Sequence, residues 1–323
     1  MLSTLTTHSP HSPHSPPQVV PALTEVLTHS HPRVKEGANA ALASVGGVIK
    51  NPEILLLVPT LLKALSEPAK FTTAALDALA HCQFEHCVDP PSLALIVPVL
   101  HRGLRERAAQ SKRKTAHITG NMCSLLAERR DIVPYLPSLL PELKAALHDP
   151  IPEVRSTGAK ALGRLCAGLG EEHFPDLLPW LLNKLAGEGE AVERAGAAQG
   201  LAEVLSALGD AKVEGMLPTL LEGCRAADSL SREGFALLWV NLPHVLGSRF
   251  ERYLEEVLPV VLEGLADDQE NVRDAALRGA QAMIAAYLQT ASGLLLPPLQ
   301  DGLADDSETR RVRTLASEKP HSA

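Results

Sequence analysis

A Leu/Val-rich segment with an early proline recurs along the sequence at nearly constant spacing. The copies read VVPALTEVL, LVPTLLKAL, IVPVLHRGL, LPELKAAL, LLPWLLNKL, MLPTLLEGC, VLPVVLEGL and LLPPLQDGL. Their prolines are Pro21, Pro59, Pro98, Pro141, Pro179, Pro218, Pro259 and Pro297, spaced by 38, 39, 43, 38, 39, 41 and 38 residues. Self-similarity at this period is typical of a stacked array of small units, in which no single globular core exists.

Each copy continues in the same way. A short polar turn is followed by a cation, and the cations are Lys35, Lys112, Arg155, Arg194, Arg232, Arg273 and Arg311. The second copy departs from this pattern, with Thr72 at the position of the cation. Small and apolar residues then recur at helical spacing, as in Val154, Gly158, Ala161 and Leu162. Each repeat is therefore expected to be two helices of roughly 12 to 17 residues joined by a tight turn.

The predicted fold is all-α, a HEAT-repeat (armadillo-like) superhelical solenoid of about eight helical hairpins. The single turn per unit and the cation after it favour the HEAT unit over the three-helix armadillo unit. The repeated proline fits either the first turn of each first helix or a kink where the array curves. Small residues on the second helices, such as Ala38 and Ala276, allow neighbouring helices to approach closely.

The two ends of the sequence depart from the array. Residues 1–17 hold three copies of His-Ser-Pro and are expected to be a disordered tail. The solenoid is assigned to residues 18–310. Residues 311–323 lose the apolar stripe of a second helix and are expected to be an irregular tail. Truncation of the array there suggests a piece of a longer solenoid or a gene model that ends early.

Composition excludes several classes of protein. Aromatic residues make up 3% of the chain, so the core must consist mainly of Leu, Val and Ala. No apolar run approaches the ~20 residues of a membrane span, and the run from Ile54 to Val58 ends at Pro59. The 5 cysteines form no disulfide framework, and their odd number fits a reducing compartment. We expect a soluble, cytoplasmic protein without membrane contact.

The net charge of −8 is unevenly distributed. Residues 1–161 carry 16 Lys and Arg against 13 Asp and Glu, whereas residues 162–323 carry 14 against 25. Acidic residues of the turns, such as Asp149 and Asp268, are expected to bridge to Arg155 and Arg273 in the same or the adjacent repeat. Such a ladder would be structural, and exposed pairs of this kind contribute about 0 to 1 kcal/mol each.

Sequence motifs of catalysis are missing. Neither GxxxxGK[ST] nor GxGxxG nor GxSxG nor HExxH occurs. We therefore expect no enzyme, no catalytic residues, no cofactor and no small-molecule substrate. The cluster His81, Cys82, His86 and Cys87 could in principle coordinate zinc, but it lacks the CxxC spacing. The preferred interpretation is a loop with core-facing cysteines, and no metal ligands are assigned; a metal-dependent enzyme is the alternative.

One turn in the third repeat is strongly basic. Its cations are Arg102, Arg105, Arg107, Lys112, Arg113 and Lys114, against the single acid Glu106. Cations at the amino end of a helix oppose the macrodipole, which costs ~0.3 to 1 kcal/mol each. A bound anion such as a phosphate backbone would relieve that repulsion. Because no aromatic residue is interleaved, we expect a structured RNA or an acidic protein surface as the ligand. A solvated basic turn without a ligand is the competing interpretation.

The stretch from residue 89 to residue 165 resembles a known family. It reads DPPSLALIVPVLHRGLRERAAQSKRKTAHITGNMCSLLAERRDIVPYLPSLLPELKAALHDPIPEVRSTGAKALGRL. This phrase resembles the HEAT region shared by fungal translation elongation factor 3 and the general-control translational activator. The continuation, GLGEEHFPDLLPWLLNKL and VERAGAAQGLAEVLSALG, is similar to the second family and is not expected in the first. The resemblance covers about residues 55–305.

The resemblance implies a function in translational control. In that family the elongation-factor-3-like segment docks on ribosomes, and the whole protein relays stress to the kinase of initiation factor 2 alpha. The basic turn would then contact the ribosome, through rRNA or ribosomal proteins. Neither the kinase-binding segment nor the ATP-binding cassettes of these families occur in this chain. The expected function is a non-catalytic scaffold that binds ribosomes and contributes to kinase activation in stress. The kinase pathway would be reached through the segments that are missing here. The alternative is a protein-only HEAT adaptor of the transport or phosphatase type, with no RNA contact.

Overall fold

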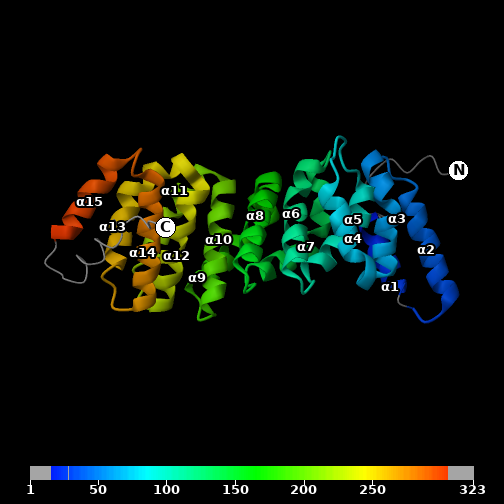
Figure 1. Ribbon diagram of the computed structural model, residues 1–323, viewed down its shortest axis with the longest axis horizontal. Coiled ribbons are helices and arrows are strands. Elements are labelled where there is room, and N and C mark those ends of the chain that lie inside the picture. The colour runs from blue at the N-terminus through cyan, green and yellow to red at the C-terminus, as the bar shows by residue number, and fades with distance from the viewer. Residues whose placement is uncertain (1–15, 28, 305–323) are drawn as a thin grey trace. The chain divides into compact units, whose positions relative to one another are not determined.

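The computed structural model describes residues 16–27 and 29–304. The chain divides into two compact units, residues 1–146 (unit 1) and residues 147–323 (unit 2). The division falls in the turn between the helices α7 (Leu136–Ala146) and α8 (Pro152–Leu169). In both units the described residues are almost entirely helical (Figure 1).

Unit 1 is built from helical hairpins. Its helices are α1 (Pro16–Val26), α2 (Pro32–Gly46), α3 (Pro52–Ser66), α4 (Pro68–His81), α5 (Pro90–Leu104), α6 (Ala109–Leu125), the 3-10 helix η1 (Arg129–Tyr135) and α7 (Leu136–Ala146). The pairs α1–α2, α3–α4 and α5–α6 each pack as a hairpin. First helices contact first helices along the stack (α3 with α5, α5 with α7), and the second helix α4 contacts α6.

Unit 2 repeats this arrangement. Its helices are α8 (Pro152–Leu169), the 3-10 helix η2 (Glu171–His173), α9 (Leu177–Ala186), α10 (Ala191–Leu208), α11 (Asp210–Gly223), α12 (Ser229–Leu246), the 3-10 helix η3 (Gly247–Tyr253), α13 (Leu254–Gly264), α14 (Glu270–Tyr287) and α15 (Ser292–Ala304). The second helices α8, α10, α12 and α14 pack in one row, each against the next (Figure 1).

The prediction of an all-α HEAT-repeat solenoid is confirmed. Three hairpins lie in unit 1 and three more, α9–α10, α11–α12 and α13–α14, lie in unit 2. Helices α7 and α8 correspond to the two halves of the remaining predicted unit, and α15 is the first helix of the eighth. Among the described residues the only extended pairing is an isolated bridge between Val88 and Leu126.

The repeated prolines lie deeper in the helices than a first-turn proline would. Pro59, Pro98, Pro218 and Pro259 are inside α3, α5, α11 and α13, so the first-turn interpretation is wrong for them. Pro179, the third residue of α9, does lie in a first turn. Elsewhere the first turn holds other prolines, at the start of α2, α3, α4, α5 and α8. A proline is tolerated there because the amide that it removes has no partner within the helix.

The predicted tails fall largely outside the described residues. Of residues 1–17, the last two are helical because α1 begins at Pro16. The predicted irregular tail at residues 311–323 lies wholly outside the described part of the chain, which ends at residue 304.

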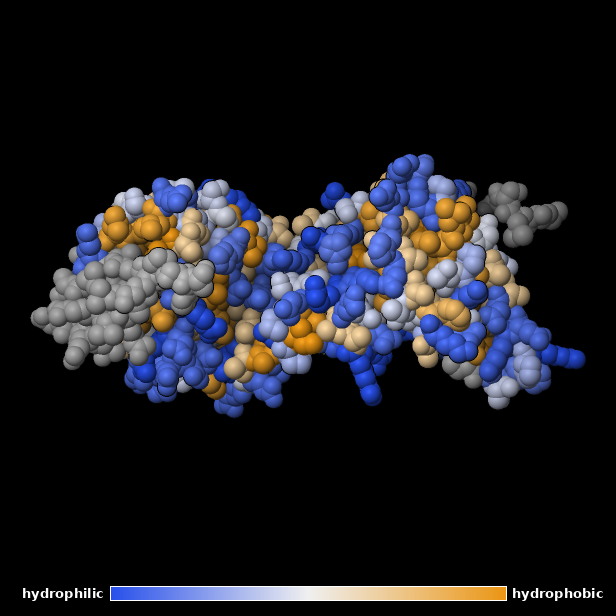
Figure 2. Space-filling model, viewed as in Figure 1, coloured by the Kyte–Doolittle hydropathy of each residue, from blue (hydrophilic) through white to orange (hydrophobic). Residues whose placement is uncertain are grey.

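The core consists mainly of Leu, Val and Ala, as the composition predicts. Unit 2 adds an aromatic cluster around the buried Phe250. The ring of Phe250 lies 6.5 Å from Trp239, 6.0 Å from Tyr253 and 5.9 Å from Tyr287, between ring centroids. On the visible face, hydrophobic side chains reach the surface in several separate patches between hydrophilic areas (Figure 2). Among the described helices, none has the length and apolar character needed to cross a membrane.

Candidate functional site

The basic turn, which carries Arg102, Arg105, Arg107, Lys112, Arg113 and Lys114, joins α5 to α6. Helix α5 begins at a well-formed cap, because the carboxylate of Asp89 accepts a hydrogen bond from the Ser92 amide at 3.0 Å. Helix α6 begins differently. Its cap residue Ala108 offers no side-chain hydrogen bond, and its first turn contains no acidic residue. The start of α6 therefore has free amides and an uncompensated positive dipole.

Arg102 and Lys114 make short polar contacts inside unit 1. Arg102 donates from Nη1 to the carbonyl oxygen of Ala64 at 2.9 Å, near the carboxyl end of α3. Burial of this guanidinium lowers the pKa of Arg102. Lys114 forms an ion pair with Asp77 of α4. These contacts join neighbouring hairpins, so Arg102 and Lys114 have structural roles.

The other cations are more exposed. Arg105 lies 3.7 Å from a Glu142 carboxylate oxygen, between Nε and Oε1, yet its side chain is 63% exposed. Lys112 is half-buried and has a partner within the chain. Arg107 and Arg113 are exposed, and within the described residues neither has an ion pair or side-chain hydrogen bond. The surface offered to a ligand is therefore centred on Arg105, Arg107 and Arg113.

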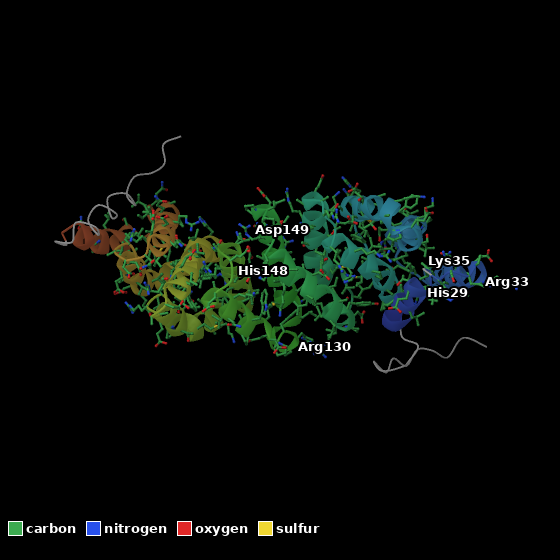
Figure 3. The ribbon with its side chains drawn as sticks, turned by 90° about the horizontal axis from the view of Figure 1, so that it is seen from below. His29, Arg33, Lys35, Arg130, His148 and Asp149 are labelled. Carbon is green, nitrogen blue, oxygen red and sulfur yellow. The ribbon has the colours of Figure 1, made fainter. Side chains whose placement is uncertain are left out.

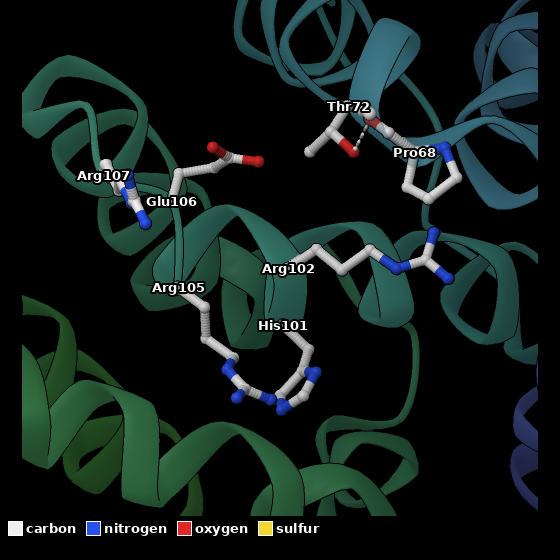
Figure 4. A pocket seen from close by; sticks show the side chains of 8 residues that line it. Pro68, Thr72, His101, Arg102, Arg105, Glu106 and Arg107 are labelled. Carbon is white, nitrogen blue, oxygen red and sulfur yellow. Dashed lines mark hydrogen bonds between the residues drawn. The ribbon is translucent and has the colours of Figure 1, made fainter.

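An open pocket of about 570 Å³ lies beside the basic turn (Figure 4). One side of it is lined by His101, Arg102, Arg105, Glu106 and Arg107. The other side is lined by three residues of α4, which are Pro68, Ala69 and Thr72. In Figure 4 the guanidinium of Arg102 reaches toward Pro68, and that of Arg105 lies beside His101.

The α4 wall of this pocket lies in the first two turns of the helix. The cap residue of α4, Glu67, makes no side-chain capping hydrogen bond. The pocket thus combines three guanidinium groups with the positive end of a helix, against one carboxylate. Such a site favours an anion with several acceptor oxygens, such as phosphate.

Unit 2 uses its arginines differently. The four arginines that follow its inter-helix turns donate from Nη1 to main-chain carbonyls five or six residues earlier. The pairs are Arg155 with Asp149 and Pro150, Arg194 with Gly189, Arg232 with Ala226 and Ala227, and Arg273 with Asp267 and Asp268. Asp149 and its neighbour His148 lie together at the turn before α8 (Figure 3). The expected bridge from turn carboxylate to arginine within one repeat is wrong, because the arginine binds the carbonyls of the turn.

The expected bridge between adjacent repeats is present at Asp268, but its partner is Arg232 and not Arg273. Arg232 binds Asp267 at 2.7 Å and Asp268 at 2.9 Å, one repeat further along the chain. Arg194 is buried and binds Glu233 at 2.9 Å. Each arginine of this ladder therefore closes its own turn, and two of them also bind the next repeat.

The His81 to Cys87 segment is a structural loop. Asn51 donates from Nδ2 to the carbonyls of His86 and Cys87, both at 3.1 Å. The His86 Nδ1 lies 2.7 Å from Oε1 of Glu53. Cys82 is half-buried and Cys87 is exposed, so the prediction of core-facing cysteines is wrong. Within the described residues, no three His, Cys, Asp or Glu side chains lie close enough together to hold a metal ion.

Sequence reasoning missed two features. His101 and the α4 residues complete the pocket beside the basic turn, but α4 lies a full repeat before that turn and carries no local signal. A second, smaller pocket in unit 2 is lined by polar residues of α8, α10 and α12. Its residues are spaced one repeat apart, so only the period could have indicated that they share a face.

Two family models match the chain. The model described as elongation factor 3/GNC1 HEAT repeat matches residues 69–176, and that described as EF3 N-terminal HEAT repeat matches residues 194–314. The first match contains the whole basic turn. The second extends the elongation-factor-3 similarity beyond the shared phrase, which we did not expect from the sequence.

Curated relatives match nearly the whole chain. The human protein named stalled ribosome sensor GCN1 is 46% identical over 292 residues, which are 90% of this chain and 11% of the relative. The Saccharomyces cerevisiae eIF-2-alpha kinase activator GCN1 is 44% identical over 297 residues, 92% of this chain and 11% of the relative. The chain thus spans about a tenth of the length of these relatives.

The solved structure of Kap121p shares the fold. It aligns with a TM-score of 0.54 at 13% identity, covering 94% of this chain and 33% of Kap121p. The fold and the family matches together define an array of HEAT repeats. Within that class, the chain belongs to the elongation factor 3/GCN1 HEAT-repeat region and is homologous to GCN1, and more distantly to elongation factor 3.

Proposed function

We propose that this chain is a ribosome-binding segment of a translational-control protein. Its homology to proteins named for sensing stalled ribosomes supports a ribosomal partner. The observation that carries the proposal is the exposed position of Arg105, Arg107 and Arg113, of which Arg105 and Arg107 also line the pocket. Among the described residues, Arg107 and Arg113 have no ion pair or side-chain hydrogen bond, and Arg105 has the distant pair with Glu142.

The proposed ligand of the basic turn is the phosphate backbone of folded rRNA. Guanidinium groups bind phosphate oxygens in bidentate geometry, and the positive dipole at the amino end of α4 adds attraction for the same anion. Among the described residues that line the pocket there is no Phe, Tyr or Trp and His101 supplies the one aromatic ring, which favours backbone contact over extensive stacking on bases. Arg102 and Lys114 hold the turn in place through Ala64 and Asp77.

The wider role in the cell is part of the same proposal. The yeast relative is named as an activator of the eIF-2-alpha kinase. We infer a cytoplasmic chain that contributes to activation of this kinase in stress, with contact to the kinase through other parts of a longer protein. The contribution of this chain would then be attachment to the ribosome.

Co-sedimentation with purified ribosomes over a salt series tests the proposal. The triple variant Arg105→Glu, Arg107→Glu and Arg113→Glu should lose most binding, since three attractive contacts become repulsive. If each arginine contacts one phosphate, neutral Gln replacements should reduce the slope of log affinity against log salt by about 1 per residue.

A matched control comes from the same unit. Arg33 and Lys35 on α2 and Arg130 on η1 are exposed cations outside the basic turn (Figure 3). Their triple replacement by Glu changes the net charge by the same amount and should retain most binding. Equal loss in both variants would mean nonspecific attraction, and unchanged binding of a folded basic-turn variant would refute the assignment.

The competing function is a protein-only HEAT adaptor. A pull-down from lysate with and without ribonuclease separates the two functions. Recovery of ribosomal proteins that is lost after ribonuclease treatment supports the proposal. Partner proteins that stay bound after ribonuclease treatment, and that also bind the basic-turn variants, favour the adaptor.

A further inference from the structure

A small polar pocket lies on the row of second helices in unit 2. It has a volume of about 180 Å³ and opens between α8, α10 and α12. Its polar lining consists of Ser156, Lys160, Gln199, Glu203, Asn241 and His244. The pocket is below the ~300 to 1,000 Å³ typical of small-molecule sites, so it suits a single side chain better than a free metabolite.

Three hydrogen-bond acceptors of this pocket have no partner among the described residues. The Oε1 of Gln199 is buried without a donor. The carboxylate of Glu203 makes neither an ion pair nor a hydrogen bond in the described part of the chain, and burial raises the pKa of Glu203. Asn241 donates from Nδ2 to the carbonyl of Leu237 at 3.0 Å, which leaves its Oδ1 available. Of the three, the Gln199 Oε1 is buried, whereas Glu203 and Asn241 are half-buried residues. A buried acceptor without a donor is uncommon in folded proteins and calls for a ligand or water.

The backbone around Glu203 is held in place by close packing of α8 against α10. A Cβ atom on Gly163 would lie 2.9 Å from the carbonyl oxygen of Glu203, so only glycine permits this approach. The backbone of Glu203 is thereby fixed beside the pocket before any ligand arrives. A site prepared in this way loses less conformational entropy on binding.

The charge of the surroundings favours a cation. Residues 147–323 carry 27 Asp and Glu against 16 Lys and Arg, which gives this unit an attractive field for basic segments. Lys160 and Arg164 are the cations near Glu203, and both lower its pKa against the effect of burial. Lys160 is exposed and lies on a flexible stem, so its ammonium can turn to solvent when a ligand enters.

We propose that this pocket binds the ammonium group of a lysine presented by a basic, extended segment of a partner protein. An ammonium carries three donors and no acceptor, which matches Gln199, Glu203 and Asn241 in number and kind. The lysine stem would lie between α10 and α12, and the rest of the segment would follow the row of second helices. This inference concerns unit 2 and does not depend on ribosome binding by unit 1.

An NMR titration of the whole chain tests this inference. The probe is a nine-residue Gly/Ser peptide with one central lysine, and its control carries Nε-acetyllysine, which has lost the charge and two of the three donors. The lysine peptide should shift the side-chain amide signals of Gln199 and Asn241 with saturation in the millimolar range. The acetylated peptide should bind at least tenfold more weakly.

Variants distinguish the pocket from general electrostatics. Glu203→Gln keeps the size of the side chain and should weaken binding of the lysine peptide about tenfold. Glu255→Gln removes the same charge from an exposed position on α13 and should leave binding unchanged. Equal binding of the lysine and acetyllysine peptides, equal affinity in Glu203→Gln, or shifts confined to other residues would each overturn the proposal. A glutamate peptide of otherwise identical sequence is a further test. The proposal would also be overturned if this peptide bound more tightly than the lysine peptide and if that binding were lost in Lys160→Gln.

Discussion

The two units place their cations at the same position of the repeat but use them differently. In unit 2 the position after each turn is an arginine, and Arg155, Arg194, Arg232 and Arg273 all bind carbonyls of their own turn. In unit 1 the corresponding residues are Lys35, Thr72 and Lys112. The hydroxyl of Thr72 donates to the carbonyl of Pro68 at 2.8 Å, and Lys35 is exposed.

The geometry of the side chains explains this difference. A guanidinium presents several donors in a fixed plane and can bind two carbonyls at once, whereas an ammonium is a compact, hydrated point charge. Unit 2 therefore closes its turns internally and carries an excess of acids. Unit 1, with 14 Lys and Arg against 11 Asp and Glu, keeps arginines on its surface at the basic turn. The comparison separates arginines that stabilise the array from arginines available to a ligand.

The largest effect should come from the buried pair of unit 2. Arg194→Ala would leave the Glu233 carboxylate, 9% exposed, without its cation. Removal of one partner of a buried ion pair costs about 3 to 5 kcal/mol. Lys35→Ala, at the same repeat position in unit 1, should change the free energy of unfolding by less than about 0.5 kcal/mol. Urea unfolding measures the free energy of unfolding of both variants. Fluorescence reports on unit 2, because Trp180 and Trp239 both lie there.

A second variant controls this comparison. In Arg194→Met with Glu233→Leu no charge remains buried, so much of the lost stability should return. A single Arg194→Ala variant as stable as Lys35→Ala would show that the ladder contributes nothing, and the distinction between the two units would fail.

Two glycines at one repeat position should respond in opposite directions to the same substitution. Gly234 and Gly37 each lie two residues after the repeat cation. A Cβ at Gly234 would collide with the carbonyl oxygen of Leu185, whereas one at Gly37 would meet no atom within 4 Å. Gly234→Ala should destabilise by about 1 to 3 kcal/mol through overpacking. Gly37→Ala should stabilise by about 0.5 to 1 kcal/mol, since alanine favours the helix interior.

Circular dichroism during urea unfolding follows both glycine variants. The contrast breaks down if both substitutions shift the midpoint in the same direction. That outcome would mean that α12 yields at its contact with Leu185, and that close packing is not what distinguishes the second helices of unit 2.

The repeat period made most of the fold predictable. Hairpins, their order and the cation after each turn all follow from local patterns that recur every ~40 residues. The interior position of Pro59 or Pro98 did not follow, because other prolines such as Pro52 and Pro90 occupy the first turns of the same helices. A spacing fixes the interval between equivalent residues but leaves open where in the helix they lie.

The basic turn was predictable as a cluster but not in its detail. Arg102 binds a carbonyl 38 residues earlier, and Lys114 pairs with a carboxylate 37 residues earlier. Both partners lie in the preceding hairpin, where nothing in the local sequence marks them. Only the packing of hairpin on hairpin separates these two structural cations from Arg105, Arg107 and Arg113.

The smallest expected effect concerns one histidine in each unit. In unit 1, the hydrogen bond to Glu53 raises the pKa of His86 above its ordinary 6.5, and the same hydrogen bond lowers the pKa of Glu53. In unit 2, burial lowers the pKa of His148, which stacks on Trp180 at 5.6 Å and has a buried Nε2 without a partner in the described chain.

The two histidines give pH dependences of opposite sign. The His86–Glu53 pair stabilises unit 1 below about pH 6.5, and this contribution is lost as pH rises through the raised pKa of His86; it also fades as pH falls toward the lowered pKa of Glu53. His148 acts in reverse. As pH falls below about 6.5 the unfolded chain takes up a proton before the folded chain does, so unit 2 loses stability.

An NMR titration of the ring protons should give a midpoint above 6.5 for His86 and below 6.5 for His148. Glu53→Gln should bring the His86 midpoint back toward 6.5 and leave His148 unchanged, because Glu53 and His148 lie in different units. Coincident midpoints in the native chain, or a His86 midpoint unaffected by Glu53→Gln, would contradict the pairing. Because His86 is 61% exposed, added salt should reduce its shift, whereas the shift of His148 comes from burial and should persist.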